Sequence, residues 1–146
     1  MEISSRFAGT TLKPFTAALD WQRMTNYAAA TGDANPFYLD DEREGGIVAP
    51  PMFAVALTWP IIERVWEFIE NPEFPLEVLS TIVHYTEHLQ FHKPMRPGGS
   101  LEIRGKVAAI VPHRSGTVAT LAFDSFDESG KAVFTEHIGA MLRGVH

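Results

Sequence analysis

The sequence predicts one α+β domain with an antiparallel sheet. In the first half of the 146 residues, apolar side chains recur with helical spacing, whereas the second half contains four runs rich in Val, Ile, Thr, Phe and Tyr. Helices and strands that are separated along a chain favour an antiparallel sheet over alternating strand–helix units. No repeat or low-complexity segment interrupts the sequence, so we expect a single domain over residues 1–146.

The first half is predicted to contain a short strand at residues 9–15 and a helix at residues 20–31. Asp20 is a favourable N-cap for this helix, and Gly32 is a helix stop. The Asp, Asn and Pro residues of segment 33–41 then predict a turn or an Asx-type loop. One buried stripe of the helix is expected from residues at helical spacing, namely Met24, Tyr27, Ala28 and Thr31.

A second helix is predicted over residues 50–69, beginning at the Pro50–Pro51 pair. Proline is tolerated in a first helical turn, because its missing N–H would have no partner there. Nearly every face of the helix is apolar as far as Ile62, which indicates a buried central helix. Pro60 removes a backbone hydrogen bond and is expected to kink the helix.

The second half is predicted to form four strands, bounded by turns that contain Pro, Gly or the sequence Asp-Glu-Ser-Gly. They cover residues 81–91, 100–111, 117–126 and 131–142. Residues 127–130 form the hairpin loop between the last two. Strands of roughly ten residues are long, and a sheet of such strands can curl around a central helix.

The composition excludes several classes of function. The chain has a formal net charge of −6 and no cysteine. The missing cysteine excludes a disulfide framework, a thiolate metal site and a cysteine nucleophile. An acidic balance lacks the basic surface with which proteins bind nucleic acid or an anionic membrane, so we expect neither partner. Without a signal-peptide or membrane-spanning pattern, a cytoplasmic location is expected.

The histidines His84, His88 and His92 are spaced four residues apart, which suggests a metal site if the segment is helical. The segment has strand propensity instead, and residues four apart on a strand are separated by about 13 Å. We therefore expect edge or pocket histidines and no metal. No phosphate-binding glycine loop or other cofactor motif is present, so no cofactor is expected.

Asp33 is the first candidate for chemistry. It follows a helix, precedes a proline-constrained loop beside Asn35, and lies shortly before the start of a second helix. The N-terminus of a helix offers free N–H groups and a positive dipole end. A carboxylate beside such groups can transfer a proton next to an oxyanion site. The alternative is that Asp33 simply caps a turn.

Three segments resemble the MaoC-like (R)-specific enoyl-CoA hydratases and 3-hydroxyacyl dehydratases. Residues 27–40 (YAAATGDANPFYLD) resemble the family pattern Y-A-x-x-[ST]-G-D-x-N-P-x-H-x-D. Residues 48–53 (VAPPMF) correspond to the I-A-H-G-M segment that opens the family's central helix, and residues 91–101 (FHKPMRPGGSL) to its F-x-x-P-x-x-x-G-D-x-L hairpin. The resemblance implies a hotdog fold, in which a curled antiparallel sheet of five or six strands wraps one long central helix.

The resemblance also implies a reaction. Such enzymes add water to, or remove it from, the double bond of a 2-enoyl thioester carried by coenzyme A or a carrier protein. A paired Asp and His activate the water, and a backbone N–H at the start of the central helix binds the thioester carbonyl. Both parts matter, because a base must move a proton while an oxyanion donor contributes about 3–4 kcal/mol.

This sequence departs from the pattern at two positions. The family aspartate is kept as Asp33, but Tyr38 occupies the position of the histidine, and Pro51 occupies that of the glycine whose N–H binds the carbonyl. Tyrosine is a poor base at neutral pH, and proline has no N–H. The chain thus resembles the non-catalytic hotdog half or subunit of these enzymes. The candidate catalytic positions are Asp33 and Tyr38, and the candidate substrate-binding residues are Asn35, Pro51, Met52 and Phe53.

The leading hypothesis is a hydratase or dehydratase subunit that shapes the acyl tunnel, while a partner hotdog chain supplies the Asp–His pair. Hotdog sheets commonly pair side by side, so a homodimer or a heterodimer is expected. One alternative is a self-sufficient homodimeric hydratase that uses Asp33 with Tyr38 or another histidine such as His84. A further alternative is a non-enzymatic module that binds acyl-CoA or acts as a scaffold. Four aromatic residues are candidates for core or tunnel wall: Phe53, Trp59, Trp66 and Phe68.

Overall fold

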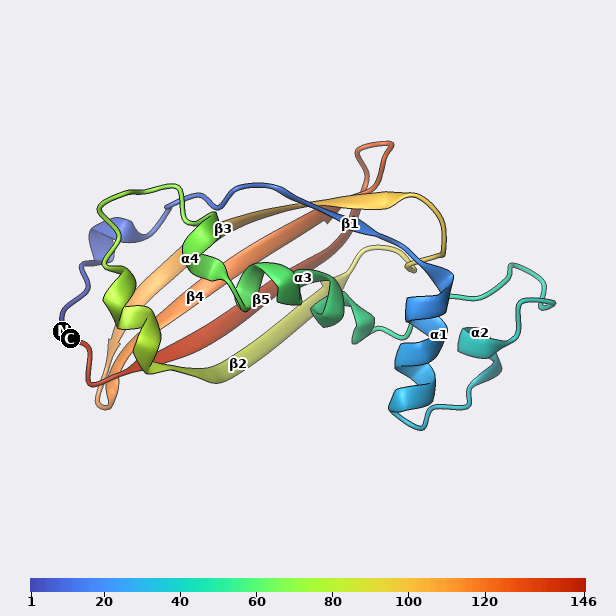
Figure 1. Cartoon of the computed structure of the whole chain (residues 1–146), viewed down its shortest axis with the longest axis horizontal. Helices are drawn as coiled ribbons and strands as arrows, with labels where there is room; N and C mark the ends of the chain where they lie inside the picture. Colours follow the sequence, from blue (N-terminus) through green and yellow to red (C-terminus); the bar gives the residue numbers. More distant parts are fainter.

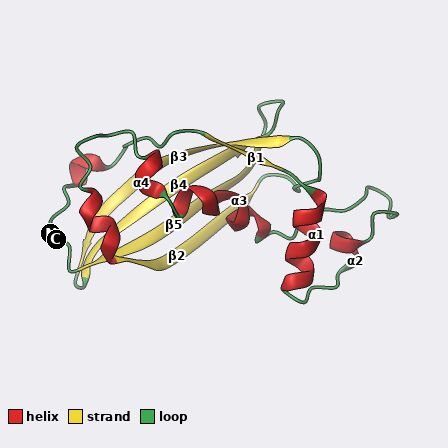
Figure 2. Ribbon diagram, viewed as in Figure 1, coloured by secondary structure: helices red, strands yellow, loops and turns green.

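The computed structural model describes residues 1–146 and contains one five-stranded antiparallel sheet whose spatial order is β1-β3-β4-β5-β2 (Figure 1). The helices α3 and α4 lie across one face of the sheet, and α1 and α2 lie beyond one of its ends (Figure 2). The strands are β1 (Phe15–Ala18), β2 (Ile82–Phe91), β3 (Ser100–His113), β4 (Gly116–Phe126) and β5 (Ala132–Arg143). None of the helices is long and apolar enough to cross a bilayer.

The helix α1 (Trp21–Ala30) has the predicted ends. The Asp20 carboxylate accepts a hydrogen bond of 2.9 Å from the Gln22 N–H, and Gly32 follows the helix with a φ of +72°. Such a φ favours glycine, because other residues meet a steric penalty there. Met24 and Ala28 are buried as expected, but Thr31 is exposed. The Thr31 hydroxyl donates to the carbonyls of Tyr27 and Ala28, so this side chain needs no place in the buried stripe that was predicted for it.

The predicted single long helix is wrong, because two short helices occupy the segment. α3 (Phe53–Ile62) and α4 (Val65–Phe68) are separated at Arg64, whose φ of −132° and ψ of 39° lie outside the helical region. Pro60 lies inside α3 near its end. Since proline cannot donate a hydrogen bond back along the helix, the last turn is weakened, and α3 stops two residues later.

Two further elements differ from the predictions. The first strand was expected at residues 9–15, but β1 begins at Phe15 and only isolated bridges precede it, at Thr11 and Leu12. Pro14 has no N–H to pair, so the ladder starts after it. In the predicted loop, one helical turn, α2 (Pro36–Leu39), follows an Asn35 side chain that accepts from the Phe37 N–H at 3.0 Å. The Asx-type geometry itself is confirmed.

The main core lies between α3 and the sheet. On α3 the side chains of Phe53, Leu57 and Ile61 are almost fully buried against β3, β4 and β5. Phe68 is half-buried and packs edge-on against Phe15, with the ring centroids 6.1 Å apart. Of the two predicted alternatives, core or tunnel wall, the core is wrong for the two tryptophans, because Trp59 is 51% and Trp66 50% exposed.

A second core joins the two ends of the chain. Phe7 packs against Phe74 with ring centroids 5.3 Å apart, and both contribute to a cluster that includes Val145. The Ile3 N–H donates to the His146 carbonyl at 3.2 Å, and the two termini lie side by side (Figure 1). The far end of the sheet is therefore closed by its own chain, which leaves the end near α1 and α2 to form a site.

Candidate functional site

An open pocket of about 530 Å³ lies where three segments that are distant in sequence meet. Backbone hydrogen bonds hold the segments together: the Val48 N–H donates to the Phe37 carbonyl at 2.9 Å, and the Ala49 N–H donates to the Met95 carbonyl at 2.8 Å. Its wall is mainly apolar with a few polar groups, as in sites for small apolar ligands. The lining residues come from the α2 region (Asn35, Phe37 and Tyr38), from the segment before α3 (Val48, Ala49 and Pro51) and from residues 91–95.

Three of the six predicted site residues line this pocket: Asn35, Tyr38 and Pro51. Asn35 caps α2 with its side-chain oxygen, and the half-buried Tyr38 projects from the same helical turn. Pro51 lies in the turn before α3 and has no N–H to offer a ligand. The sequence segments that resembled one family therefore do converge on one cavity.

The other three predicted residues lie outside the pocket lining. Asp33 is exposed, and its carboxylate accepts a hydrogen bond of 3.1 Å from the Asn35 N–H, so it closes an Asx turn. Met52 is 48% exposed. Phe53 is 1% exposed and contacts the Tyr27 ring edge-on at a centroid distance of 5.7 Å. The structure thus places the Asp33 carboxylate in a turn and the Tyr38 side chain in the pocket wall.

His92 is a pocket residue that sequence reasoning identified only as one of three edge or pocket histidines. Its Nε2 lies 3.0 Å from the Thr135 hydroxyl oxygen, and that hydroxyl donates to the Asp124 carboxylate at 2.9 Å. Since the Thr135 proton is directed to Asp124, its oxygen accepts from His92, and the imidazole carries its proton on Nε2. His84, by contrast, does not line the pocket. The signal for His92 was its place in the matched hairpin segment.

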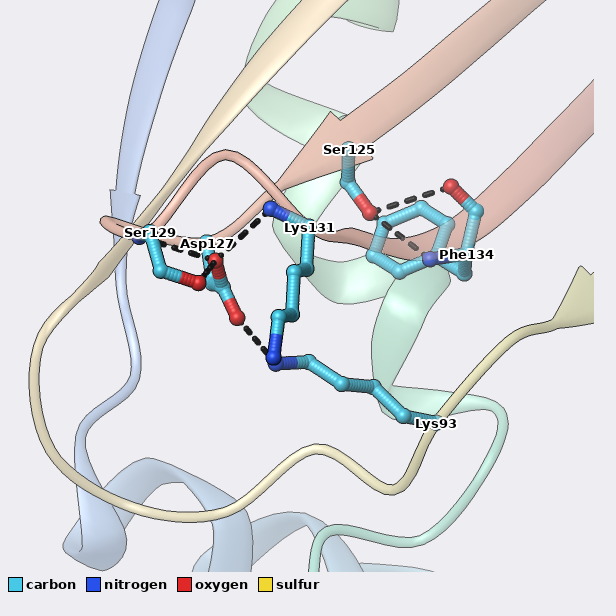
Figure 3. Close-up of polar contacts among 6 residues, drawn as sticks. All are labelled: Lys93, Ser125, Asp127, Ser129, Lys131 and Phe134. Atoms are coloured by element: carbon cyan, nitrogen blue, oxygen red, sulfur yellow. Dashed lines mark hydrogen bonds and ion pairs between the residues drawn. The ribbon is translucent and has the colours of Figure 1, made fainter.

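Lys93 follows His92 in the pocket wall and is held by an ion pair with Asp127 of the β4–β5 hairpin loop (Figure 3). Asp127 also accepts hydrogen bonds from the Ser129 N–H at 2.9 Å and the Lys131 N–H at 3.0 Å. Lys93 and the Ser129 hydroxyl, with these N–H groups, hold the pKa of the Asp127 carboxyl well below its usual range. This single carboxylate fixes the hairpin loop against the pocket segment.

A second contact stiffens the same hairpin. The ladder between β4 and β5 shifts register between Asp124 and Phe126, at a bulge that contains Ser125. The buried Ser125 hydroxyl accepts from the Phe134 N–H at 2.9 Å and donates to the Phe134 carbonyl at 3.0 Å (Figure 3). The side chain therefore replaces the backbone pairing that the bulge removes, because buried polar groups must be paired.

Known proteins resemble the chain in sequence and in fold. The family model described as FAS1-like, dehydratase domain region, matches residues 6–136. A UPF0336 protein of Streptomyces griseus is 26% identical over 141 residues, which cover 92% of this chain and 91% of that protein.

Two solved structures extend the comparison. A chain of the C-terminally truncated HadBC (3R-hydroxyacyl-ACP dehydratase) complex from Mycobacterium tuberculosis gives a TM-score of 0.78 at 16% identity, covering 97% of this chain and 99% of that chain. The unliganded R-hydratase PhaJ1 from Pseudomonas aeruginosa gives a TM-score of 0.69 at 22% identity, and the match covers 92% of this chain and 80% of that chain. These likenesses confirm the hotdog fold. With the family model matching most of its length, the chain belongs to the FAS1-like dehydratase region family of MaoC-like hotdog proteins.

Proposed function

We propose that this chain is the acyl-binding subunit of a 2-enoyl-thioester hydratase or 3-hydroxyacyl-thioester dehydratase, and that a second hotdog chain supplies the catalytic Asp–His pair. The observation that carries the proposal is the chemistry of the pocket. Pro51 occupies the position at which the family donates an N–H, and Tyr38 occupies the position of the family histidine. The retained Asp33 carboxylate accepts a hydrogen bond within its own turn.

The missing donor is sufficient to impair the reaction. Addition of water to an enoyl thioester places negative charge on the carbonyl oxygen, and the loss of one oxyanion donor typically costs about 10²- to 10³-fold in rate. A small movement of the backbone cannot restore this donor at Pro51, because proline has no N–H. A partner with an intact motif would provide both the base and the donor in its own pocket.

The surface for such a partner is β2, an edge strand paired only with β5. Four apolar residues of β2 are 41–53% exposed: Ile82, Val83, Tyr85 and Phe91. A long edge strand with exposed apolar side chains is a template for pairing with another chain. The solved HadBC structure that shares this fold is a complex, which supports a hetero-oligomeric role for this chain.

The acyl chain is proposed to run along the solvent-exposed side of α3 and α4. Trp59 and Trp66 are half exposed there, and Met52 lies at the start of the same segment. An uncovered group of large apolar side chains on a single chain marks a binding surface. In the assembled enzyme these side chains would form the tunnel wall, covered by the partner and the substrate.

The test is the hydration of crotonyl-CoA by the purified chain, alone and after co-purification with a hotdog chain from the same genome that has an intact G-D-x-N-P-x-H motif. We expect hydration only with the partner present. Asp33→Asn should leave that rate unchanged, as should Asp41→Asn in the exposed loop that follows α2. Substantial hydration by the chain alone that is abolished by Asp33→Asn would contradict the proposal.

One observation favours a second candidate, a homodimeric hydratase that acts without a partner. His92 lines the pocket with Tyr38 and is oriented by Thr135 and Asp124, so it could replace the missing base. This candidate predicts hydration by the chain alone that is lost in His92→Gln and kept in His88→Gln. If calorimetry detects no acyl-CoA binding with or without a partner, both enzymatic candidates fail and only a scaffold role remains.

A further inference from the structure

Two carboxyl groups lie buried beside the β2 edge, away from the pocket. Glu136 of β5 is 0% exposed, and Glu87 of β2 is half-buried. Leu89 is opposite Glu136 and Glu87 is opposite Ile138, so the two glutamates are diagonal neighbours on the sheet face that packs on α3. All four carboxyl oxygens are buried, and none has a hydrogen-bond partner within the chain.

The surroundings of the glutamate pair contain almost no hydrogen-bond donor. On β4, the residue opposite Glu136 is the fully buried Phe123. On α3, the Thr58 hydroxyl donates to the Val55 carbonyl at 3.2 Å, and the same hydroxyl is the one neutral donor close enough to Glu136 to lower its pKa. His84 Nε2 lies 3.4 Å from the Glu87 carboxylate, but it is also 3.2 Å from the Thr86 carbonyl, and the His84 side chain is 59% exposed.

The buried pair therefore retains a proton. Burial, with repulsion from the Glu87 carboxylate, raises the pKa of Glu136 to about 8. That single proton satisfies one acceptor, whereas ionised carboxylates can accept several hydrogen bonds. An unpaired buried carboxylate lowers stability unless a cation or several donors reach it. A cation from outside the chain would supply the donors that the remaining oxygens lack.

We propose that Glu87 and Glu136 form a recognition site for an arginine or lysine side chain of the partner hotdog chain that pairs with β2. The identity of that partner rests on the function proposed above. Side chains of directly opposed residues on neighbouring strands lie about 5 Å apart, so a strand added at the free edge places side chains beside Glu87. A guanidinium group suits such a site, because it binds carboxylates through two parallel hydrogen bonds.

The site also favours a heterodimer over a homodimer. β2 contains two histidines but no lysine or arginine, so a second copy of this strand cannot supply the permanent cation. Lys93, the basic residue that follows the strand, is already paired with Asp127. Two copies paired through β2 would leave both glutamate pairs without a partner, and the chain's net charge of −6 would add general repulsion.

Proton release on binding tests the proposal without reference to activity. A cation beside Glu136 favours its ionised form, so binding at pH 7 should release most of one proton per heterodimer. The measurement is titration calorimetry of the chain with the co-purified partner, separated and recombined, in buffers of different ionisation heat. Glu136→Gln should abolish the release. Zero release or proton uptake by the wild-type complex would overturn the proposal.

A second measurement uses Glu87→Gln, which keeps the shape of the side chain and removes its charge. We expect the heterodimer Kd to rise by roughly 30-fold or more and to depend less on salt, because a buried charge pair is lost. The exposed Glu77→Gln is the matched control and should leave the Kd unchanged. An unchanged Kd for Glu87→Gln in a chain that does bind a hotdog partner overturns this inference alone. Failure of the wild-type chain to bind any such partner overturns the proposed function as well.

Discussion

The pocket and the β2 edge differ in how far their polar groups are satisfied. In the pocket region the chain supplies its own partners: Asp33 closes a turn, His92 is bonded through Thr135, and Lys93 is paired with Asp127. At the β2 edge the buried oxygens of Glu87 and Glu136 have no hydrogen-bond partner, and the nearest basic group is the exposed His84, 3.4 Å from Glu87.

Exposed apolar side chains occur in both regions: Phe37 and Phe91 of the pocket wall are 50% and 42% exposed, and three further apolar residues of β2, Ile82, Val83 and Tyr85, are 41–53% exposed. On α3 and α4, the tryptophans Trp59 and Trp66 are half exposed, whereas Phe53 at the start of α3 is buried. Buried unpaired carboxyl groups together with uncovered apolar side chains mark a surface for a second chain, and the two features occur together only at the β2 edge. The contrast locates the unsatisfied buried polar groups of this chain at the β2 edge of the sheet.

The largest effect is expected for Phe53→Ala, in the buried side of the central helix. Removing a fully buried phenylalanine should lower the free energy of unfolding by about 3–5 kcal/mol, through lost burial and the cavity left behind. The neighbouring Met52→Ala should change it by less than about 0.5 kcal/mol, because Met52 is exposed. Chemical denaturation of both variants measures this difference. Similar losses would show that Met52 also belongs to the core.

A smaller effect, confined to assembly, is expected for Trp59→Glu on the exposed side of the helix. The stability of the isolated chain should be nearly unchanged, whereas the affinity for the partner chain should fall by roughly 30-fold, as for a typical aromatic hot spot. Trp21→Glu provides the matched control, because Trp21 is similarly exposed at the start of α1. Equal effects of the two substitutions on binding would contradict a specific surface on α3.

The Glu136 carboxyl predicts a pH dependence of stability. Its pKa of about 8 in the folded protein exceeds the ordinary value of 4.5, so the folded state holds a proton that the unfolded chain releases between these values. Stability should therefore fall as the pH rises from 4.5 to 8, at no more than about 1.4 kcal/mol per pH unit for one proton.

Glu136→Gln removes that titration. Denaturation curves at pH 5, 6.5 and 8 should show the variant gaining stability relative to wild type as the pH rises. The exposed Glu77→Gln should run parallel to wild type across the same range. Parallel behaviour of Glu136→Gln would mean that Glu136 is ionised in the folded chain at neutral pH.

The smallest effect is expected for Asp127→Asn in the β4–β5 hairpin loop, which holds the pocket residue Lys93. The amide keeps an oxygen for the Ser129 and Lys131 N–H groups but loses the charge that pairs with Lys93. Because the pKa of Asp127 is depressed, this contribution is present above the ordinary carboxyl pKa and is lost in acid. Thermal denaturation should show a slightly lower Tm at pH 7 and none of that difference at low pH. A Tm deficit that persists in acid would contradict the charge-pair role.

The sequence predicted the elements whose signals are local. The bounds of β2 to β5 lie within two residues of the predicted ones, and α1 has its expected caps at Asp20 and Gly32. The break at Arg64 was missed, because an apolar run does not reveal where packing ends a helix. The resemblance identified Asn35, Tyr38 and Pro51 as neighbours, and the structure places them in one pocket.

The glutamate pair lay beyond sequence reasoning for a different reason. Glu87 and Glu136 belong to separate strands, and only the register between β2 and β5 places them side by side. A single-residue shift in that register would turn one of them to the opposite face. The alternation of β5 puts Glu136 on the face of Phe134 and Ile138, but neither strand's own pattern shows that the two acidic residues meet. Three-dimensional pairing was needed to find an unsatisfied site.

The central claim is that catalysis belongs to a partner chain. The most direct measurement compares two substitutions in the reconstituted complex during crotonyl-CoA hydration: Asp33→Asn in this chain and replacement of the motif histidine by glutamine in the partner. The account predicts that the partner substitution abolishes hydration and that Asp33→Asn leaves it unchanged. Loss of hydration with Asp33→Asn, and its survival without the partner's histidine, would contradict the account.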